Sequence, residues 1–344
     1  MYSFSNDYSE GAHPIILERL SSTNMDQTDV YGDDSYSAHA AELIRAACGR
    51  EDAEVHFFLG GTQANFTIIC AALRSYQGVY SSSLGHINTH EAGAIEHTGH
   101  KVLALPATAG KLTAAQIEES HLLYLNDPKR EHWVQPKMVY VSHPTEVGTL
   151  YSRRELTELA DVCRKYGLYL YLDGARLGYA LASPGSDLTL KDIAQLCDAF
   201  YIGGTKCGAL IGEAAVLLTP ELKTDFHTIM KQNGAVLAKS RLLGLQFEAL
   251  FTDNLYEKIC RHGIDMAMCL KEGFAAKGLA VVAESFTNQQ FPILPENMYR
   301  SLLPMYAMGS WEVYSNGTRA VRFCTSWATS EEQVGKLIRD IKSF

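Results

Sequence analysis

The stretch AFYIGGTKCGAL, residues 199–210, is the segment from which both fold and function can first be predicted. Ala199 to Ile202 are apolar and predict a short buried strand. Two glycines, which let a flat ligand approach the backbone, come before Thr205 and Lys206. Partial burial would lower the pKa of the Lys206 amine and make it nucleophilic, which suits a Schiff base with an aldehyde cofactor. A surface lysine after a glycine turn is the alternative, and this stretch alone leaves both open.

The composition narrows the class of protein. The chain has 344 residues, 47% of them hydrophobic, and a net charge of −9. This length allows one large domain or two ordinary ones. The acidic balance and the lack of a basic cluster argue against nucleic acid as a partner. No apolar run reaches the roughly 18 residues of a membrane span. The N-terminus lacks a signal-peptide pattern and the eight cysteines form no CxxC pair, so we expect reduced thiols and a cytoplasmic protein.

Short apolar segments alternate with helical patterns through the first two thirds of the chain. Several of these segments are apolar on both faces, which is typical of parallel strands covered by helices on both sides. We therefore predict an α/β fold with a mainly parallel sheet. The predicted strands are residues 55–59, 78–82, 101–106, 137–142, 168–173, 199–202 and 214–218.

The two ends of the chain differ from this pattern. Residues 1–32 read as loop with a short apolar segment after Pro14, and the histidine-rich stretch is expected to be helical from about Thr89. Asn316-Gly317 predicts a hairpin with a two-residue turn. We predict a large domain over residues 1–245 and a small α+β domain over 246–344. Long helices are expected on both sides of this boundary, near 221–231, 236–252, 255–277 and 331–344.

The motif LGGTQAN, residues 59–65, places two glycines between a predicted strand and a predicted helix. Backbone amides of Gly60 and Gly61 at the helix N-terminus, with the Thr62 hydroxyl, would form a phosphate cradle. No GK[ST] follows, so it is not a P-loop. An ordinary strand-to-helix turn is the alternative.

The motif YLYLDGARLG, residues 169–178, ends an apolar strand with Asp173. A buried carboxylate needs a partner, and a pyridinium N–H would serve, because the carboxylate would keep the ring of pyridoxal 5′-phosphate (PLP) protonated as an electron sink. Arg176 is placed to hold a substrate carboxylate or the cofactor phenolate. The alternative is an Asp173–Arg176 ion pair.

Three histidines near predicted strand ends could bind a metal, stack on a flat ring or face the site: His86, His90 and His143. His90-Glu91 does not continue as HExxH, and no third ligand is spaced with His86 and His90, so we predict no metal site. His86 is placed to stack on a flat cofactor with one nitrogen free for proton transfer. His143 follows a buried strand and is expected to face the site, although a satisfied loop histidine competes with that interpretation.

Arg322 lies inside the apolar strand AVRF of the C-terminal region. A guanidinium on an enclosed face needs an anion, and a substrate α-carboxylate would bind it bidentately. A structural salt bridge is the alternative.

The order GGTQAN, HINTHEAGA, SHPTEVGT, YLDGARLG, GGTKCGA and VRFCTSW resembles the L-threonine aldolases of low specificity, over nearly the whole chain. FSNDYSEGAHP and DVYGDD extend the similarity at the N-terminus. These enzymes belong to the aromatic amino acid β-eliminating lyase group of fold type I PLP enzymes. The resemblance implies a PLP-dependent transferase-like fold of the seven-stranded type, and homodimers or homotetramers with active sites at subunit interfaces.

The resemblance also implies roles for individual residues. Lys206 would carry PLP as a Schiff base, with His86 stacked on its ring, and His86, His143 or a water would serve as the base. The implied cofactor-binding residues are Lys206, Asp173, Gly60, Gly61, Thr62, His86, Arg176 and Lys239. The implied substrate-binding residues are Asn6, Tyr31, Arg176 and Arg322.

The expected reaction is retro-aldol cleavage of L-threonine or L-allo-threonine to glycine and an aldehyde. The rivals are β-elimination or racemisation on the same fold, because a fold does not determine a reaction. A PLP-binding regulator without turnover is the third alternative.

Overall fold

A computed structural model describes all 344 residues of the chain. Its centre is a seven-stranded sheet in the order β2-β8-β7-β6-β5-β3-β4. β8 pairs antiparallel with both neighbours, and the other strands run in one direction. The prediction of a mainly parallel seven-stranded sheet is confirmed. The strands are β2 (Glu54–Phe58), β3 (Gln77–Ser82), β4 (Lys101–Leu105), β5 (Gln135–Ser142), β6 (Tyr169–Asp173), β7 (Ala199–Gly203) and β8 (Glu213–Leu217).

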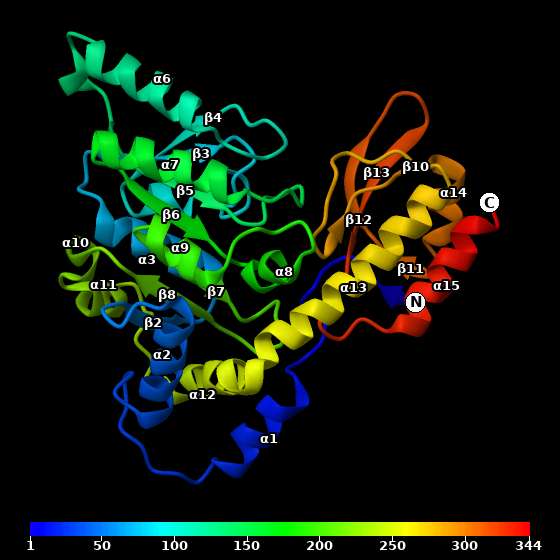
Figure 1. Ribbon diagram of the computed structural model, residues 1–344, viewed down its shortest axis with the longest axis horizontal. Coiled ribbons are helices and arrows are strands. Elements are labelled where there is room, and N and C mark those ends of the chain that lie inside the picture. Colours follow the sequence, from blue (N-terminus) through cyan, green and yellow to red (C-terminus); the bar gives the residue numbers. More distant parts are fainter.

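Helices cover both faces of this sheet (Figure 1). Successive strand residues enter opposite cores: Leu170 and Leu172 pack on one face and Tyr171 on the other, as expected for period-two alternation. The first core is closed by α2 (Ser35–Cys48), α7 (Arg153–Tyr166), α8 (Leu177–Ala182), α9 (Leu190–Leu196) and α12 (Arg241–Phe251). The second is closed by α3 (Gly61–Ala72), α4 (His86–Thr89), α5 (Ala94–His97), α10 (Pro220–Lys223) and α11 (Phe226–Gln232). α6 (Ala114–Asn126) packs beside α7.

A smaller sheet lies at the other end of the molecule. The long helix α13 (Leu255–Ala276) runs from α12 to this sheet, and α15 (Glu331–Lys342) packs along α13 (Figure 1). β1 (Tyr2–Ser3) pairs in parallel with β11 (Tyr306–Ala307), so the N-terminus joins this end of the molecule. The predicted boundary at residue 245 falls inside α12 and stays a prediction. The other elements here are β9 (Gln289–Gln290), β10 (Ile293–Pro295), α14 (Glu296–Leu302), β12 (Gly309–Val313) and β13 (Thr318–Cys324).

Some predicted elements were wrong in position or length. The apolar segment after Pro14 is a helix, α1 (Pro14–Ser22), not a loop. The helix expected near 221–231 is broken because Asp225 adopts a left-handed conformation, φ 55°. The histidine-rich helix starts at His86 rather than Thr89 and is interrupted where Ala92 and Gly93 have positive φ.

The predicted hairpin is present, but its loop is longer than two residues. β12 and β13 pair antiparallel up to Val313 and Arg319. The Tyr314 N–H donates to the Thr318 carbonyl, and Gly317 takes the left-handed conformation, φ 78°.

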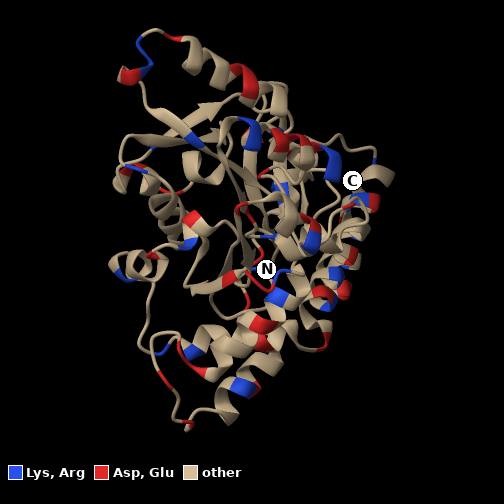
Figure 2. Ribbon diagram, turned by 60° about the vertical axis from the view of Figure 1, so that its left-hand side comes forward, with Lys and Arg blue, Asp and Glu red and all other residues tan.

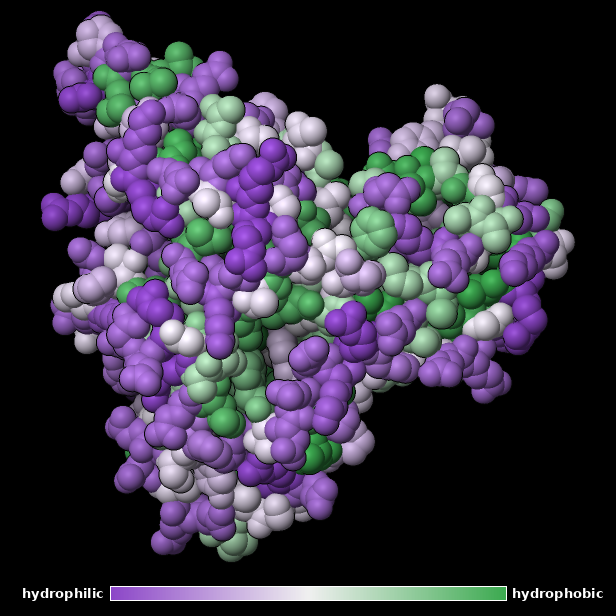
Figure 3. Space-filling model, viewed as in Figure 1, coloured by the Kyte–Doolittle hydropathy of each residue, from purple (hydrophilic) through white to green (hydrophobic).

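The surface is mixed in character. Basic and acidic residues are interspersed over the ribbon (Figure 2). The space-filling view shows a notch between the large body and the smaller sheet (Figure 3). None of the helices combines the length and the apolar character needed to cross a membrane.

Candidate active site

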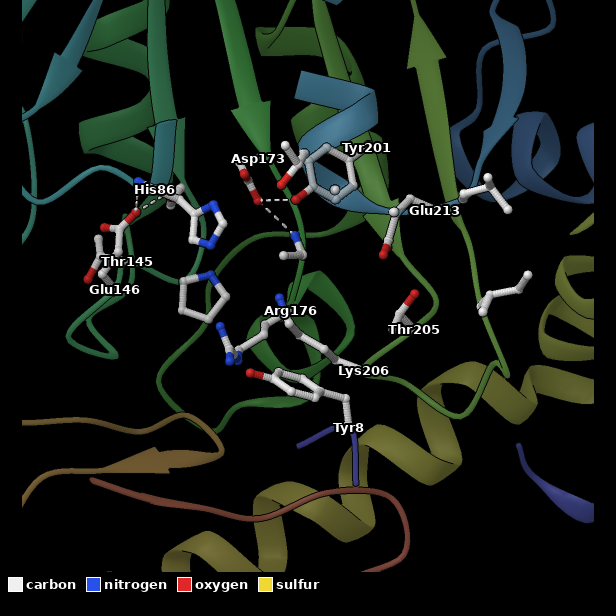
Figure 4. Close-up of a pocket in the computed structure, with 18 residues that line it drawn as sticks. Tyr8, His86, Thr145, Glu146, Asp173, Arg176, Tyr201, Thr205, Lys206 and Glu213 are labelled. Carbon is white, nitrogen blue, oxygen red and sulfur yellow. Dashed lines mark hydrogen bonds between the residues drawn. The ribbon is translucent and has the colours of Figure 1, made fainter. Parts of the chain in front are cut away.

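A cavity of about 330 Å³ opens where the parallel strands end (Figure 4). This is the edge at which open α/β sheets bind ligands. β6 ends at Asp173, β7 leads to Lys206, and β2 leads to the N-terminus of α3. The cavity brings together these predicted residues: Gly60, Gly61, Thr62, His86, Asp173, Arg176 and Lys206.

Lys206 is enclosed by the cavity walls. Burial lowers the pKa of its amine, and the nearby Arg176 charge lowers it further, against the opposing charges of Asp7 and Glu213. The ammonium forms no salt bridge, whereas Arg176 is paired with Asp7. A desolvated lysine without a fixed partner is suited to attack a carbonyl carbon.

Asp173 is 4% exposed, so its carboxylate needs partners. Tyr201 donates to Oδ1 and Tyr140 to Oδ2, each at 2.6 Å. Asn65 Nδ2 donates to Oδ2 at 3.0 Å, and the Ala175 N–H donates to Oδ1 at 3.0 Å. Burial opposes ionisation, but the charge of His86 and these hydrogen bonds hold the pKa of Asp173 below its usual value. The site therefore presents a fixed negative charge.

The N-terminus of α3 forms the opposite feature, a cluster of backbone donors. Gly60 is its N-cap and no side chain caps the first turn. A Cβ at Gly61 would stand 2.8 Å from the Tyr201 hydroxyl oxygen, so only glycine fits there without displacing that hydroxyl. Uncapped amides with a helix dipole favour an anion such as a phosphate. A buried amine, a fixed carboxylate and an anion cradle in one cavity fit the groups of PLP.

His86 lies at the first turn of α4 and is held on two sides. Its ring Nδ1 lies 2.7 Å from Glu91 Oε1, and its backbone N–H donates to Glu146 Oε1 at 2.9 Å. Burial alone would lower the pKa of His86, but the hydrogen bond to Glu91 and the charge of Asp173 raise it above its ordinary value. Nε2 is left free on a ring that lines the cavity.

The raised pKa of His86 makes the effect of Glu91 on stability depend on pH. Protonated His86 stabilises the folded chain below its unfolded pKa of about 6.5, and this gain is lost as pH rises through the higher folded pKa. We expect Glu91→Gln to lower the Tm of the cofactor-free protein more at pH 6 than at pH 9. Glu96→Gln, at an exposed acid of the same segment, is the matched control. An equal loss at both pH values would contradict this assignment.

The two predicted carboxylate-binding arginines differ in their partners. Arg176 donates to Asp7 through Nε at 2.7 Å and Nη2 at 3.0 Å. Asp7 is fully buried and also accepts from Asn288 at 2.8 Å. Arg322 lies on β13, outside the cavity wall, and donates to the Ser5 carbonyl at 3.0 Å. It has no carboxylate partner, so the alternative of a structural salt bridge finds no support in the structure.

Four further predicted residues, besides Arg322, do not line the cavity. His143 is fully buried: Tyr151 N–H donates to its Nδ1 at 3.3 Å, and burial lowers its pKa to about 4. The wall is formed instead by the next three residues, so the expected position of His143 facing the site was wrong. Asn6 Oδ1 caps its own turn, accepting from Tyr8 N–H at 3.0 Å. Tyr31 and Lys239 are exposed and lie away from this cavity.

The cavity also contains residues that were not predicted. Tyr8 comes from the N-terminal segment, and the half-buried Glu146 and the buried Glu213 are acids in its walls (Figure 4). Glu146 lies in SHPTEVGT, three residues after His143, so its position close to a strand end could have predicted it as a site residue. Glu213 comes before a predicted strand, not after one, so this pattern does not identify it. Asp7 lies in FSNDYSEGAHP, where no pattern distinguishes it from its neighbours.

The chain is similar to known proteins over most of its length. The beta-eliminating lyase family matches residues 8–296. A low-specificity L-threonine aldolase of Pseudomonas aeruginosa is 32% identical, over 98% of this chain and 96% of its own. A solved structure of threonine aldolase from Leishmania major is 47% identical with a TM-score of 0.97, covering 100% of this chain and 99% of that one.

A more distant structure shows the fold. Aspartate aminotransferase of Thermus thermophilus has a TM-score of 0.71 at 17% identity, covering 100% of this chain and 91% of that one. The architecture is that of fold type I PLP enzymes, and both this fold and the matched family are PLP-dependent. Because the family match extends over most of the chain and the cavity has the groups that PLP requires, the chain belongs to the beta-eliminating lyase family.

Proposed function

We propose that this chain catalyses retro-aldol cleavage of L-threonine, L-allo-threonine and related β-hydroxy-α-amino acids to glycine and an aldehyde. The observation that carries the proposal is the cavity, which unites Lys206, Asp173 and the uncapped α3 N-terminus. The similarity to threonine aldolases over the whole length of the chain selects this reaction among those of the fold.

The cofactor would be PLP, which the Lys206 amine would hold as a Schiff base. PLP would supply an electron sink for the electrons of the Cα–Cβ bond that breaks. Asp173 would hold the proton on the ring nitrogen, because its carboxylate stays ionised in the cavity. The amides of Gly60, Gly61 and Thr62 would hold the phosphate. Arg176, whose Nη1 is not engaged by Asp7, orients the substrate carboxylate.

His86 is the base that accepts the proton of the substrate hydroxyl. Glu91 occupies Nδ1 at 2.7 Å and so fixes the ring, leaving Nε2 to accept a proton directly or through a water. We assign no proton transfer to His143, because its side chain is fully buried and does not line the cavity. Glu146, from the loop after His143, accepts a hydrogen bond from the backbone N–H of His86.

A panel of amino acids tests the proposed reaction. Purified protein loaded with PLP is incubated with L-threonine, L-allo-threonine, L-serine and L-alanine, and aldehydes, glycine, ammonia, keto acids and D-amino acids are measured. We expect glycine and acetaldehyde in equal amounts from the threonines. Ammonia and a keto acid would identify an eliminating enzyme, D-alanine a racemase, and no product a non-catalytic PLP protein; each of these results would overturn the proposal.

Arg322 is proposed as a second contact for the substrate carboxylate. It lacks an acidic partner and stands close enough to His90 to help lower the pKa of that histidine, after burial and the neighbouring His86. We expect Arg322→Lys to raise KM and to lower kcat/KM by about 2 kcal/mol in free-energy terms, with Tm and PLP absorbance unchanged. Lysine cannot reproduce the bidentate fork.

Arg319 provides the matched control on the same strand. It is paired with Glu296 at 3.3 Å, so Arg319→Lys is expected to leave KM unchanged. A lower Tm with normal KM in Arg322→Lys would identify Arg322 as a structural residue instead.

We also propose that the enzyme works as a homodimer or homotetramer. Tyr31 is 44% exposed and lines a pocket with Leu237 and Ser240, and Lys239, which lies between these two in sequence, is exposed. Their exposure supports our proposal that they reach the cavity of a second copy. Light scattering of the purified protein measures the oligomeric state directly.

A further inference from the structure

Glu213 is a buried carboxyl group in the cavity to which the proposed reaction gives no role. It is the first residue of β8, the strand that runs against the others, and so it begins where its neighbours end. Its register partners are Gly203, on the strand that leads to Lys206, and Phe58, on the strand that leads to the Gly60 turn. Glu213 therefore lies at the anion-binding end of the cavity, beside Thr205 (Figure 4).

The loop before Lys206 donates one hydrogen bond to this carboxylate. The Gly204 N–H donates to Glu213 Oε2 at 3.0 Å, while the neighbouring Thr205 hydroxyl donates to the Gly212 carbonyl at 3.4 Å. Burial nevertheless dominates and raises the pKa of Glu213 to about 7, against the opposing effect of the Lys206 charge. The ionisable groups that face it from β6, β7 and the loops that follow them are Tyr171, Asp173, Tyr201 and Lys206.

An ionised Glu213 conflicts with a phosphate in the adjacent cradle. A phosphate monoester carries about −1.5 to −2 charges at neutral pH, and a like charge nearby disfavours both ions. Protonation of Glu213 removes the repulsion and supplies an O–H donor to the phosphate.

We propose that Glu213 is a ligand of the cofactor phosphate and binds it as the neutral acid, so that one proton passes from solvent to the Glu213 carboxylate when the phosphate binds at alkaline pH. The inference rests on the proposed function for the identity of the cofactor only; it is independent of the reaction. Below about pH 7 the acid already holds its proton. Above that pH the affinity falls by about tenfold for each pH unit, because each binding event must take up a proton.

Calorimetry counts the proton. Cofactor-free protein is titrated at pH 8.5 with pyridoxamine 5′-phosphate, which has the ring and the phosphate but no aldehyde to react with Lys206. Two buffers of different ionisation enthalpy give the number of protons taken up. We expect the unmodified protein to take up one proton more than Glu213→Gln. The glutamine keeps a side-chain oxygen that accepts from the Gly204 N–H, but it cannot be protonated. Glu146→Gln, at the half-buried acid on the other side of the cavity (Figure 4), is expected to keep the wild-type count.

A spectroscopic measurement covers the case in which Glu213→Gln does not fold. Infrared difference spectra of the unmodified protein at pH 8.5 are expected to gain a carboxylic-acid carbonyl band when pyridoxamine 5′-phosphate binds. Equal proton counts in the full chain and Glu213→Gln, or no such band, would overturn the inference. Neither readout uses turnover, so failure of the proposed aldol cleavage leaves this result separately interpretable.

Discussion

Replacing Lys206 with alanine is expected to abolish turnover, lowering kcat/KM by roughly 10⁴-fold or more, since covalent catalysis loses its nucleophile. The reason is structural: Lys206 is the amine that the cavity encloses, with its pKa lowered by burial. The variant should lose the near-ultraviolet or visible absorbance of lysine-bound PLP. Borohydride should no longer attach the cofactor covalently.

The control for Lys206→Ala is Lys191→Ala, which removes an exposed lysine of α9. That variant should keep both the absorbance and full activity. A reducible lysine adduct that survives in Lys206→Ala, located by peptide mapping, would show that another amine holds the cofactor.

The second large effect is expected from Asp173→Asn. The amide cannot hold a proton on the ring nitrogen, so we expect kcat to fall on the order of 10²–10³-fold, as for loss of a preorganised electrostatic contact. PLP should still bind. Tm should also fall, because the amide NH₂ cannot accept from one of the two tyrosine hydroxyls that Asp173 now satisfies, and an unsatisfied buried group costs about 1–3 kcal/mol.

Tyr140→Phe separates these two effects. It removes one hydrogen bond to Asp173 Oδ2 and keeps the charge. If the charge is what matters, Tyr140→Phe should retain far more of the wild-type kcat than Asp173→Asn, with a comparable fall in Tm. Activity within a few-fold of wild type in Asp173→Asn would show that Asp173 has a structural role only.

The part of the site that the sequence predicts is the part built on parallel strands. Lys206, Asp173 and Gly60 each follow an apolar run, and parallel strands bring their carboxyl ends to one edge of the sheet. Period-two burial and glycine turns therefore sufficed to place them together. The same reasoning failed for His143, because a strand end defines the edge but not which residue of the following loop faces the cavity.

The remaining residues depend on contacts distant in sequence. Glu213 reaches the cavity because β8 runs antiparallel, and strand direction is not visible in an apolar run such as AAVLL. Asp7 meets Arg176 from 169 residues away. Patterns within a short window carry no information on such pairs. Glu91 differs, because it lies five residues from His86, but its pairing depends on the left-handed residues that end the expected helix after it.

The course of the N-terminal segment has a mechanical consequence. β1 is zipped to β11, and the Phe4 carbonyl accepts from the Cys324 N–H at 2.7 Å, so the first residues are anchored to the smaller sheet. Asp7 is then clamped to Arg176, and the His13 N–H donates to the Gly208 carbonyl at 2.8 Å, both on the large body. This segment therefore connects the smaller sheet to Arg176. A rotation of the smaller sheet would act through it on the arginine that we propose orients the substrate.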